Sequence, residues 1–295
     1  MAAVESGHSK HMKMSSLRLA VTTLVAMLAF AGNSLLCRLA LSDGLIDAAT
    51  FTLVRLMSGA LMLVALVSWQ RRPVVVDGSW QSATALFIYA AGFSFAYVSL
   101  SAATGALLLF GAVQATMIGY GLWLGEKLTL RQILGALLAI AGLVILLLPG
   151  LQAPPLFGSM LMLMAGVAWG MYSLRGRGMG DPTFITMGNF VRAVPMAAVL
   201  SALFIQDIEA EWSGLIYAVV SGALASGAGY ALWYAVLPHL KSVTAATVQL
   251  SVPVLAAIGG VVFLAEPITL RLGVASMATL GGVAMVILSK RSVGK

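Results

Sequence analysis

"LGEKLTLR", residues 124–131, and "LAEPITLR", residues 264–271, are one charged turn that occurs twice in a very apolar chain. The two copies lie nearly half of the 295-residue sequence apart. Further matches keep the same offset, such as Gly142 with Gly282. Self-similarity at a fixed spacing is the signature of a duplicated structural unit. The repeated turn therefore predicts a fold built from two related halves.

The composition indicates that lipid is the solvent for most of the chain. Hydrophobic residues make up 60% of the sequence and charged residues 9%, whereas a soluble globular protein is roughly 45–50% apolar and about 25% charged. Apolar runs of about 20 residues, long enough to cross a hydrocarbon core as helices, alternate with short polar breaks. These runs predict an all-α integral membrane protein with ten transmembrane helices, near residues 17–40, 48–69, 81–101, 104–125, 130–149, 156–175, 183–205, 213–236, 244–265 and 270–289.

The charges on the loops predict an orientation in the membrane. All 17 lysines and arginines except Arg38, Arg55, Arg192 and Arg271 fall in the terminal segments or in one alternating set of loops. Cytoplasmic loops of membrane proteins carry an excess of Lys and Arg. We therefore expect both termini, including a cytoplasmic tail at 1–16, on the inner side of a bacterial-type inner (plasma) membrane. This placement accounts for the net charge of +7 without a nucleic-acid partner.

Five predicted spans fall in each half, at 17–149 and 156–289. Because five is odd, the second half enters the membrane from the opposite face, so the halves are inverted repeats. Secondary transporters with this arrangement bind their substrate near the midplane, between the repeats. One chain already contains both halves, so a monomer suffices.

Matching segments in the two halves resemble a known transporter superfamily. "TLVRLMSGA" (52–60) aligns with "NFVRAVPMA" (189–197), which pairs Arg55 with Arg192, and each half closes with a hairpin built on the charged turn. Over about residues 17–290 the chain resembles the EamA-type members of the drug/metabolite transporter superfamily. That resemblance implies export of small metabolites, often amino acids. The layout is also similar to YddG-type aromatic amino-acid exporters, which implies aromatic or other neutral amino acids as substrates.

The ionisable residues lead us to expect a carrier that no proton gradient drives. Every Asp and Glu lies in a loop or at a predicted helix end, and the three histidines lie outside the spans. Proton-driven carriers usually keep a carboxylate or histidine inside the membrane. The sequence therefore predicts a facilitator or exchanger that works by alternating access. The alternative is a proton-coupled multidrug or metabolite exporter that uses Glu126 or Glu266.

The charged turn is expected to have a structural or gating role, through Glu126, Arg131, Glu266 and Arg271. Its glutamates end a helix, where the negative end of the dipole disfavours an anion, and an arginine one tight turn later would offset that cost. Thr129 followed by Gln132 predicts a capping box for the next helix. Thr269 can cap in the same way, but Leu272 cannot complete the box.

Two arginines fall inside predicted spans and are placed with the structural or gating residues. A charge at the centre of a helix costs about 2.5–3.5 kcal/mol on insertion scales, so Arg55 and Arg192 each need a partner or water. One interpretation is a bond to carbonyls at a neighbouring helix end, or a side chain that reaches the headgroups. The other is a clamp for the carboxylate of an amino-acid substrate.

Aromatic and amide side chains are the candidates for the substrate site. Tyr89, Phe93 and Tyr97 follow i, i+4 and i+8 along one span, so they share a helix face. Aromatic rings with polar tips suit a wall for amphipathic solutes, and an amide in lipid must face protein or water. The alternative for all of them is helix packing. The predicted set is Asn33, Tyr89, Phe93, Tyr97, Gln114, Trp169, Tyr172, Tyr230, Trp233, Tyr234 and Gln249.

Other function classes find less support in the sequence. The spans contain no nucleophile–base pair and no metal-binding motif such as HExxH, so we expect no enzyme, no metal and no cofactor. A membrane scaffold would need neither inverted halves nor buried polar groups. The small residues of "SGALASGAG" (221–229) favour close helix packing. We therefore expect a secondary transporter for a small-molecule substrate, in contact with the lipid bilayer.

Overall fold

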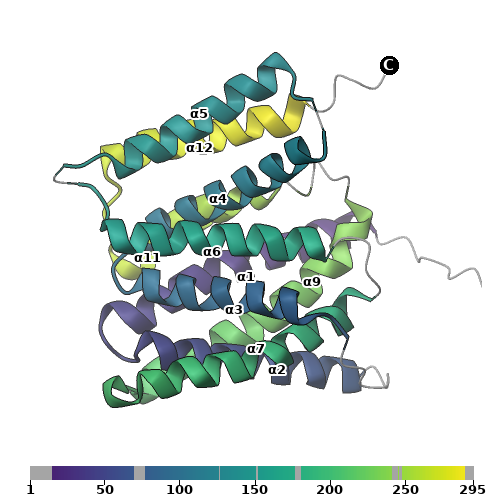
Figure 1. Cartoon of the computed structure of the whole chain (residues 1–295), viewed down its shortest axis with the longest axis vertical. Coiled ribbons are helices and arrows are strands. Elements are labelled where there is room, and N and C mark those ends of the chain that lie inside the picture. Colours follow the sequence, from purple (N-terminus) through teal and green to yellow (C-terminus); the bar gives the residue numbers. More distant parts are fainter. Residues whose placement is uncertain are drawn as a thin grey trace, which may run out of the picture.

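The chain folds into a bundle of helices, most of which run side by side in Figure 1. In this computed structural model the described residues are 15–69, 77–125, 127–150, 152–176, 181–240, 245 and 248–289. They contain no strand beyond an isolated bridge between Ile46 and Ala210. The first half contributes α1 (Ser16–Ser42), α2 (Ala48–Trp69), α3 (Trp80–Tyr97), α4 (Ala102–Trp123) and α5 (Leu130–Leu147). The second half contributes α6 (Leu156–Arg175), α7 (Pro182–Leu203), α8 (Trp212–Val220), α9 (Gly229–Val236), α11 (Ser251–Leu264) and α12 (Leu270–Ser289).

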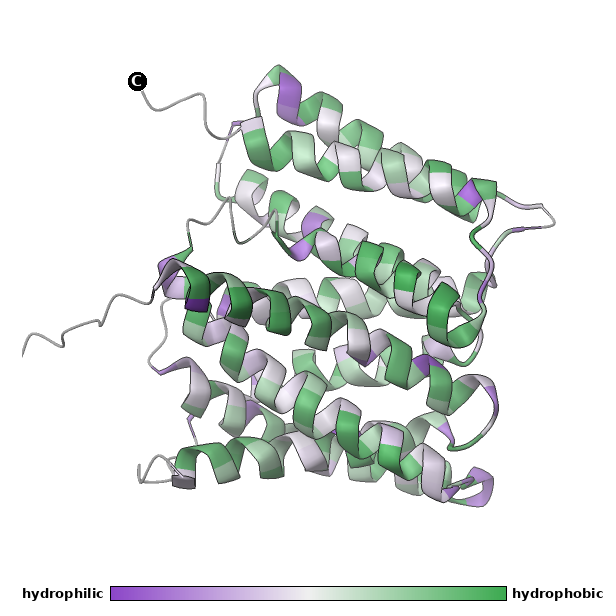
Figure 2. Ribbon diagram, turned by 180° about the vertical axis from the view of Figure 1, so that it is seen from behind, coloured by the Kyte–Doolittle hydropathy of each residue, from purple (hydrophilic) through white to green (hydrophobic). Residues whose placement is uncertain are grey.

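The expectation of an all-α membrane protein is confirmed. Eight helices of the described residues are long and apolar enough to cross a membrane, counting Trp212–His239 as one, and α11 is a shorter apolar helix. Hydrophobic residues cover most of the helix surfaces, while strongly hydrophilic ones gather mainly at helix ends and connections (Figure 2). The narrow break expected after the third run is present between Tyr97 and Ala102. The count of ten spans stays a prediction.

One expected span is not a regular α-helix. Between α8 and α9 the backbone forms the π-helix η2 (Ser221–Ala228), which covers the small-residue segment. After α9 the same span ends in the short 3₁₀ helix η3 (Leu237–His239). π-helical turns inside α-helices are frequent at functional sites. A Cβ on Gly222 would collide with the Arg55 carbonyl, so this glycine lets η2 lie directly against α2. The close packing expected of the segment is confirmed.

Both caps expected in the repeated turn are present. The Thr129 hydroxyl accepts from the Gln132 backbone nitrogen at 3.4 Å. The Gln132 side-chain oxygen accepts from the Thr129 backbone nitrogen at 2.8 Å, which completes the capping box. The Thr269 hydroxyl accepts from the Leu272 nitrogen at 3.1 Å without a returning bond. Caps depend on residues three apart in the chain, so the local sequence is enough to predict them.

The helices that follow the two turns, α5 and α12, pack side by side in opposite directions (top of Figure 1). Gly135 near the start of α5 faces Gly282 near the end of α12, and Gly142 farther along α5 faces Thr279. Because the contacts run in opposite orders, the start of α5 lies beside the end of α12. The two copies of the turn therefore lie at opposite ends of this pair.

The acidic connections gather at one end of the bundle. The Asp47 nitrogen donates to the Glu209 carbonyl at 2.9 Å, and the Glu211 nitrogen donates to the Leu45 carbonyl at 2.8 Å. These bonds join the α1–α2 connection to the α7–α8 connection. Arg175 lies at the opposite end, where its guanidinium donates to the side chain of Gln81. Among the described residues, these two acidic connections and Arg175 therefore lie at opposite ends of the bundle.

The prediction that Arg271 of the same turn would pair with Glu266 is wrong. The Glu266 carboxylate pairs instead with Arg38 of α1, with Nε and Oε1 at 3.2 Å, and accepts from the Ala102 nitrogen at 2.8 Å. The left-handed backbone at Ala265 ends α11 and turns Glu266 toward the start of α4, where the positive dipole end favours an anion. Arg271 donates to the Leu148 carbonyl at the end of α5.

Candidate functional site

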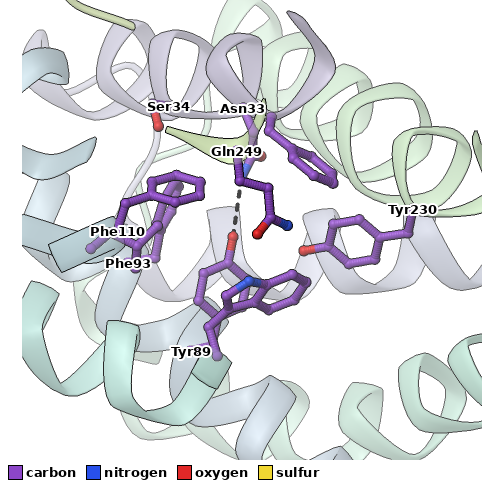
Figure 3. A pocket seen from close by; sticks show the side chains of 10 residues that line it. Asn33, Ser34, Tyr89, Phe93, Phe110, Tyr230 and Gln249 are labelled. Atoms are coloured by element: carbon purple, nitrogen blue, oxygen red, sulfur yellow. Dashed lines mark hydrogen bonds between the residues drawn. The ribbon is translucent and has the colours of Figure 1, made fainter. Parts of the chain in front are cut away.

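A small cavity lies between helices of the two halves. Residues of α1, α3 and α4 form one side of it, and Trp169 of α6, Tyr230 of α9 and Gln249 form the other. Its free volume of about 20 Å³ accommodates roughly one water molecule. Figure 3 shows the hydroxyl groups of Tyr89 and Tyr230 and the amide of Gln249 pointing toward the same space. The full lining is Phe30, Asn33, Ser34, Tyr89, Phe93, Leu109, Phe110, Trp169, Tyr230 and Gln249.

Trp169 is the hub of the aromatic wall. Its ring centroid lies 4.8 Å from that of Tyr89, 5.0 Å from that of Tyr230 and 5.4 Å from that of Tyr172, on which it stacks. These separations are in the range of favourable aromatic pairs. Rings from α3, α6 and α9 thus meet in one cluster, so a displacement of any of these helices changes the shape of the cavity.

A directed chain of hydrogen bonds crosses the cavity wall. The Ser221 hydroxyl of η2 donates to the side-chain oxygen of Asn33, Oδ1, at 2.6 Å, because that oxygen can only accept. The amide nitrogen of Asn33 then donates to the Tyr89 hydroxyl oxygen at 3.4 Å (dashed line, Figure 3). Ser221 therefore orients Asn33, and Asn33 orients Tyr89.

Arg55 lies directly behind this wall and is buried, with 1% of its surface exposed. Its Nη2 donates to the Tyr89 hydroxyl at 3.0 Å, and its Nε donates to Ser226 of η2 at 3.3 Å. The guanidinium carbon stands 5.2 Å from the ring centre of Tyr89 and 4.8 Å from that of Phe93. Within the described part of the chain no carboxylate bonds to it, and its Nη1 has no hydrogen-bond partner.

Arg192, the counterpart of Arg55 in the other half, has different surroundings. Its Nη1 donates to the carbonyls of Asp77 and Gly188, the second at 3.1 Å, near the start of α3. From the sequence, such a bond to backbone carbonyls was one interpretation of both arginines. Of the two, Arg55 alone lies against the cavity wall.

A second, smaller cavity lies toward the end of the bundle that carries Arg175. Tyr172 and Tyr234 line it, together with Asn189, whose amide donates to the Tyr172 hydroxyl at 3.5 Å. The Trp169–Tyr172 stack separates it from the central cavity. Polar and aromatic side chains therefore continue from the middle of the bundle toward this end.

The structure brings together six of the eleven residues that the sequence proposed for the substrate site. Tyr172 and Tyr234 belong to the second cavity, and Tyr97, Gln114 and Trp233 line neither one. The Tyr97 hydroxyl donates to the Ala102 carbonyl at 3.3 Å, and Trp233 packs on Phe30. The central six are Asn33, Tyr89, Phe93, Trp169, Tyr230 and Gln249.

The remaining proposed residues lie elsewhere. Gln114 is buried, and its side-chain nitrogen has no partner among the described residues. Arg131 is exposed at the start of α5, and Glu126 lies outside the described residues.

Sequence reasoning missed four residues that line the cavity. Phe30, Leu109 and Phe110 resemble any other apolar residue of a span, so no local signal distinguishes them. Ser34 follows Asn33 directly, and a polar pair inside an apolar run is a signal that would have found it. The missed ion-pair partner, Arg38, ends the "NSLLCR" segment (33–38) of the same helix.

Comparison with known proteins identifies the kind of protein that carries this site. The sequence model of the EamA-like transporter family matches residues 17–148 and again residues 156–288. The family is one of membrane transporters rather than enzymes. A solved structure superposes with a TM-score of 0.65 at 20% identity, covering 95% of this chain and 100% of that chain, and this likeness shows the fold.

Three relatives illustrate the range of similarity. An uncharacterized protein of Pseudomonas aeruginosa is 55% identical over 275 residues, 93% of this chain and 96% of its own. An uncharacterized transporter of Archaeoglobus fulgidus is 25% identical over 88% of this chain and 93% of its own. The threonine/homoserine exporter RhtA of Salmonella typhimurium is 32% identical over 140 residues, 45% of this chain and 46% of its own.

Proposed function

Because the chain belongs to the EamA-like transporter family, we propose that it is a secondary transporter that exports amino acids and related small metabolites by alternating access. The small cavity of aromatic and amide side chains between the two halves is the observation that carries this proposal. Apolar rings and a few convergent polar groups are typical of small-molecule sites. The partial similarity to a threonine/homoserine exporter supports neutral amino acids as the substrate class. We include aromatic amino acids in the proposal because aromatic rings line the cavity.

The size of the cavity supports an occluded state. A free volume of about 20 Å³ is too small for an amino acid, so a substrate requires the helices around it to separate. Arg38 and Glu266 hold α1, α4 and the end of α11 together at the acidic end. In our proposal this end opens in one state and the end with Arg175 opens in the other.

We further propose ten spans arranged as two inverted five-helix repeats, 17–149 and 156–289, which together make one transport domain. The antiparallel pairing of α5 with α12 supports this arrangement. The charge pattern supports an inner-membrane location with both termini in the cytoplasm. A single chain contains both sides of the cavity, which supports a monomer.

The coupling we propose is that of a facilitator or exchanger. Among the described residues no carboxylate or histidine lines either cavity, and Glu266 is engaged by Arg38 and the start of α4. Substrate gradients then drive transport, without a proton relay through the centre.

Counterflow in proteoliposomes tests the proposal. Vesicles that contain the purified protein are loaded with unlabelled threonine, homoserine, leucine, phenylalanine or tryptophan, and uptake of the same labelled amino acid is followed without any imposed gradient. We expect at least one of them to accumulate. If none of the five amino acids is taken up, amino-acid transport is contradicted. Uptake that occurs only with an imposed pH gradient favours the proton-coupled exporter instead.

A variant pair ties the uptake to the cavity. Trp169→Ala removes the ring at the hub of the wall and is expected to lower uptake about tenfold, since each aromatic pair contributes roughly 0.5–1.5 kcal/mol. Trp123→Ala removes a tryptophan that is 79% exposed at a helix end and is expected to leave uptake unchanged. Equal effects of the two changes would remove the cavity from the proposed mechanism.

A further inference from the structure

The Tyr89 hydroxyl is restricted to one chemical role. Arg55 and the amide nitrogen of Asn33 can only donate, so the Tyr89 oxygen accepts from both, at 3.0 and 3.4 Å. A hydroxyl oxygen has two acceptor positions, and both are occupied. Tyr89 can therefore act toward the cavity only as a donor. A bound solute meets its O–H group, not its lone pairs.

The neighbourhood of this donor is positively charged. Arg55 brings a full charge within hydrogen-bond distance of the Tyr89 oxygen, where it polarises the O–H bond. In the described part of the chain no carboxylate bonds to Arg55, and its Nη1 is a buried donor without an acceptor. Removing a charge from water costs several kcal/mol unless another charge compensates it. The buried charge of Arg55 therefore favours an anion at this side of the cavity.

A second hydroxyl reaches the same space. Tyr230 lines the cavity, and its hydroxyl points toward the same space as that of Tyr89 (Figure 3). An anion placed between them would accept from both groups. Hydrogen bonds to a charged acceptor are about twice as strong as neutral ones, so the arrangement favours a carboxylate over an amide or an amine.

We propose that the cavity recognises its solute by a carboxylate, with Tyr89 as the direct donor and Arg55 as the positioning cation behind it. The transported solutes are then amino acids and other small carboxylic acids. Their amides and decarboxylated amines are excluded. The aromatic rings that surround the donors, such as Trp169, contact the rest of the solute. This inference rests on the proposed function and specifies which chemical group the same site selects.

The test measures selectivity rather than activity alone. Leucine, threonine and phenylalanine are each compared with the corresponding amide and with the amine that lacks the carboxyl group. Competition in counterflow gives one readout. Quenching of the fluorescence of Trp169 in detergent gives a binding readout that needs no transport, with Trp169→Phe as the blank. We expect the wild-type protein to prefer the acid at least tenfold over the amide.

Conservative variants identify the groups responsible. Tyr89→Phe keeps the ring and removes only the donor, and we expect it to reduce the preference for the acid by roughly tenfold to a hundredfold. Arg55→Gln is expected to reduce the preference for the acid by a similar factor. Arg55→Lys keeps a positive charge and is expected to retain most of this preference. Tyr120→Phe removes a hydroxyl from a residue that is 41% exposed on α4 and serves as the matched control. A merely structural role of Arg55 would lower binding of acid and amide equally.

Each outcome separates this inference from the proposed function. Uptake without preference for the acid, or a preference unchanged in Tyr89→Phe, overturns the inference and leaves the transporter in place. Selective binding of acids without uptake supports the inference and contradicts the transport proposal. Absence of both binding and uptake overturns both.

Discussion

At the scale of single residues, the ion pair among the described residues joins side chains that lie far apart in the sequence. Arg38 and Glu266 form an ion pair at 3.2 Å between side chains that are 22% and 13% exposed. The same carboxylate accepts from the first nitrogen of α4, and Arg38 also donates to the carbonyls at the end of α3. One pair thus joins four helices at the acidic end.

Glu266→Gln tests the contribution of this pair to stability. The change removes the charge and keeps the shape, so we expect a loss of about 1–3 kcal/mol from the free energy of unfolding. Thermal unfolding of the purified protein should then show a melting temperature lower by several degrees. The control is Glu211→Gln, an exposed residue before α8 without a side-chain cap bond. Equal melting temperatures of the two variants would contradict the structural role of Glu266.

At the scale of helices, glycine residues at a contact allow two helices to pack closely. α5 and α12 touch through Gly135 and Gly282, where an added Cβ on Gly135 would lie 2.6 Å from the Gly282 carbonyl oxygen. The outer faces of this pair are lined by exposed leucine and isoleucine side chains, for example Leu134 and Leu137. A membrane supplies the solvent that such faces need. Small residues on the inner faces then allow backbone contact.

Two alanine substitutions separate packing from helix propensity. Gly135→Ala forces α5 away from α12, and we expect it to destabilise the protein by about 1–3 kcal/mol. Gly281→Ala has open space around its Cβ and is expected to leave stability unchanged or slightly higher. Melting temperatures of the two purified variants give the comparison. A Gly135→Ala variant as stable as Gly281→Ala would show that the contact is not tight in the membrane.

At the scale of the whole molecule, the two halves meet around one cavity. The aromatic wall takes Tyr89 from the first half and Trp169 and Tyr230 from the second. The π-helix η2 presses Ser221 and Ser226 against the first half, where they bond to Asn33 and Arg55. Neither half alone contains the site. A movement of one half against the other would therefore change access to the cavity.

Cysteine labelling tests the inverted arrangement. The single cysteine, Cys37, is buried, so Cys37→Ala supplies a silent background. Lys127→Cys and Ile268→Cys place one thiol in each copy of the charged turn at exposed positions. We expect an impermeant maleimide to label the second in intact cells and the first only after the membrane is opened. Labelling of both from the same side would exclude inverted repeats.

Local features of the sequence were enough to predict membrane helices and the caps at the starts of two of them. The length of the apolar runs predicted membrane helices, Thr129 with Gln132 predicted the capping box, and Thr269 predicted a cap without the box. These features depend on neighbours within a few residues. The π-helix η2 was not predicted, because "SGALASGAG" favours close packing without specifying the turn that achieves it.

The composition and the repeated turn by themselves determined that this is a helical membrane protein, since burying apolar runs and satisfying backbone bonds in lipid leaves helices as the answer. Only the tertiary structure decided which polar groups meet. It separated Arg55, placed behind Tyr89, from Arg192, bound to carbonyls, although both occupy equivalent positions in the sequence. Side chains inside a bundle find partners through the packing of whole helices, and that packing brings Arg38 to Glu266 across the fold.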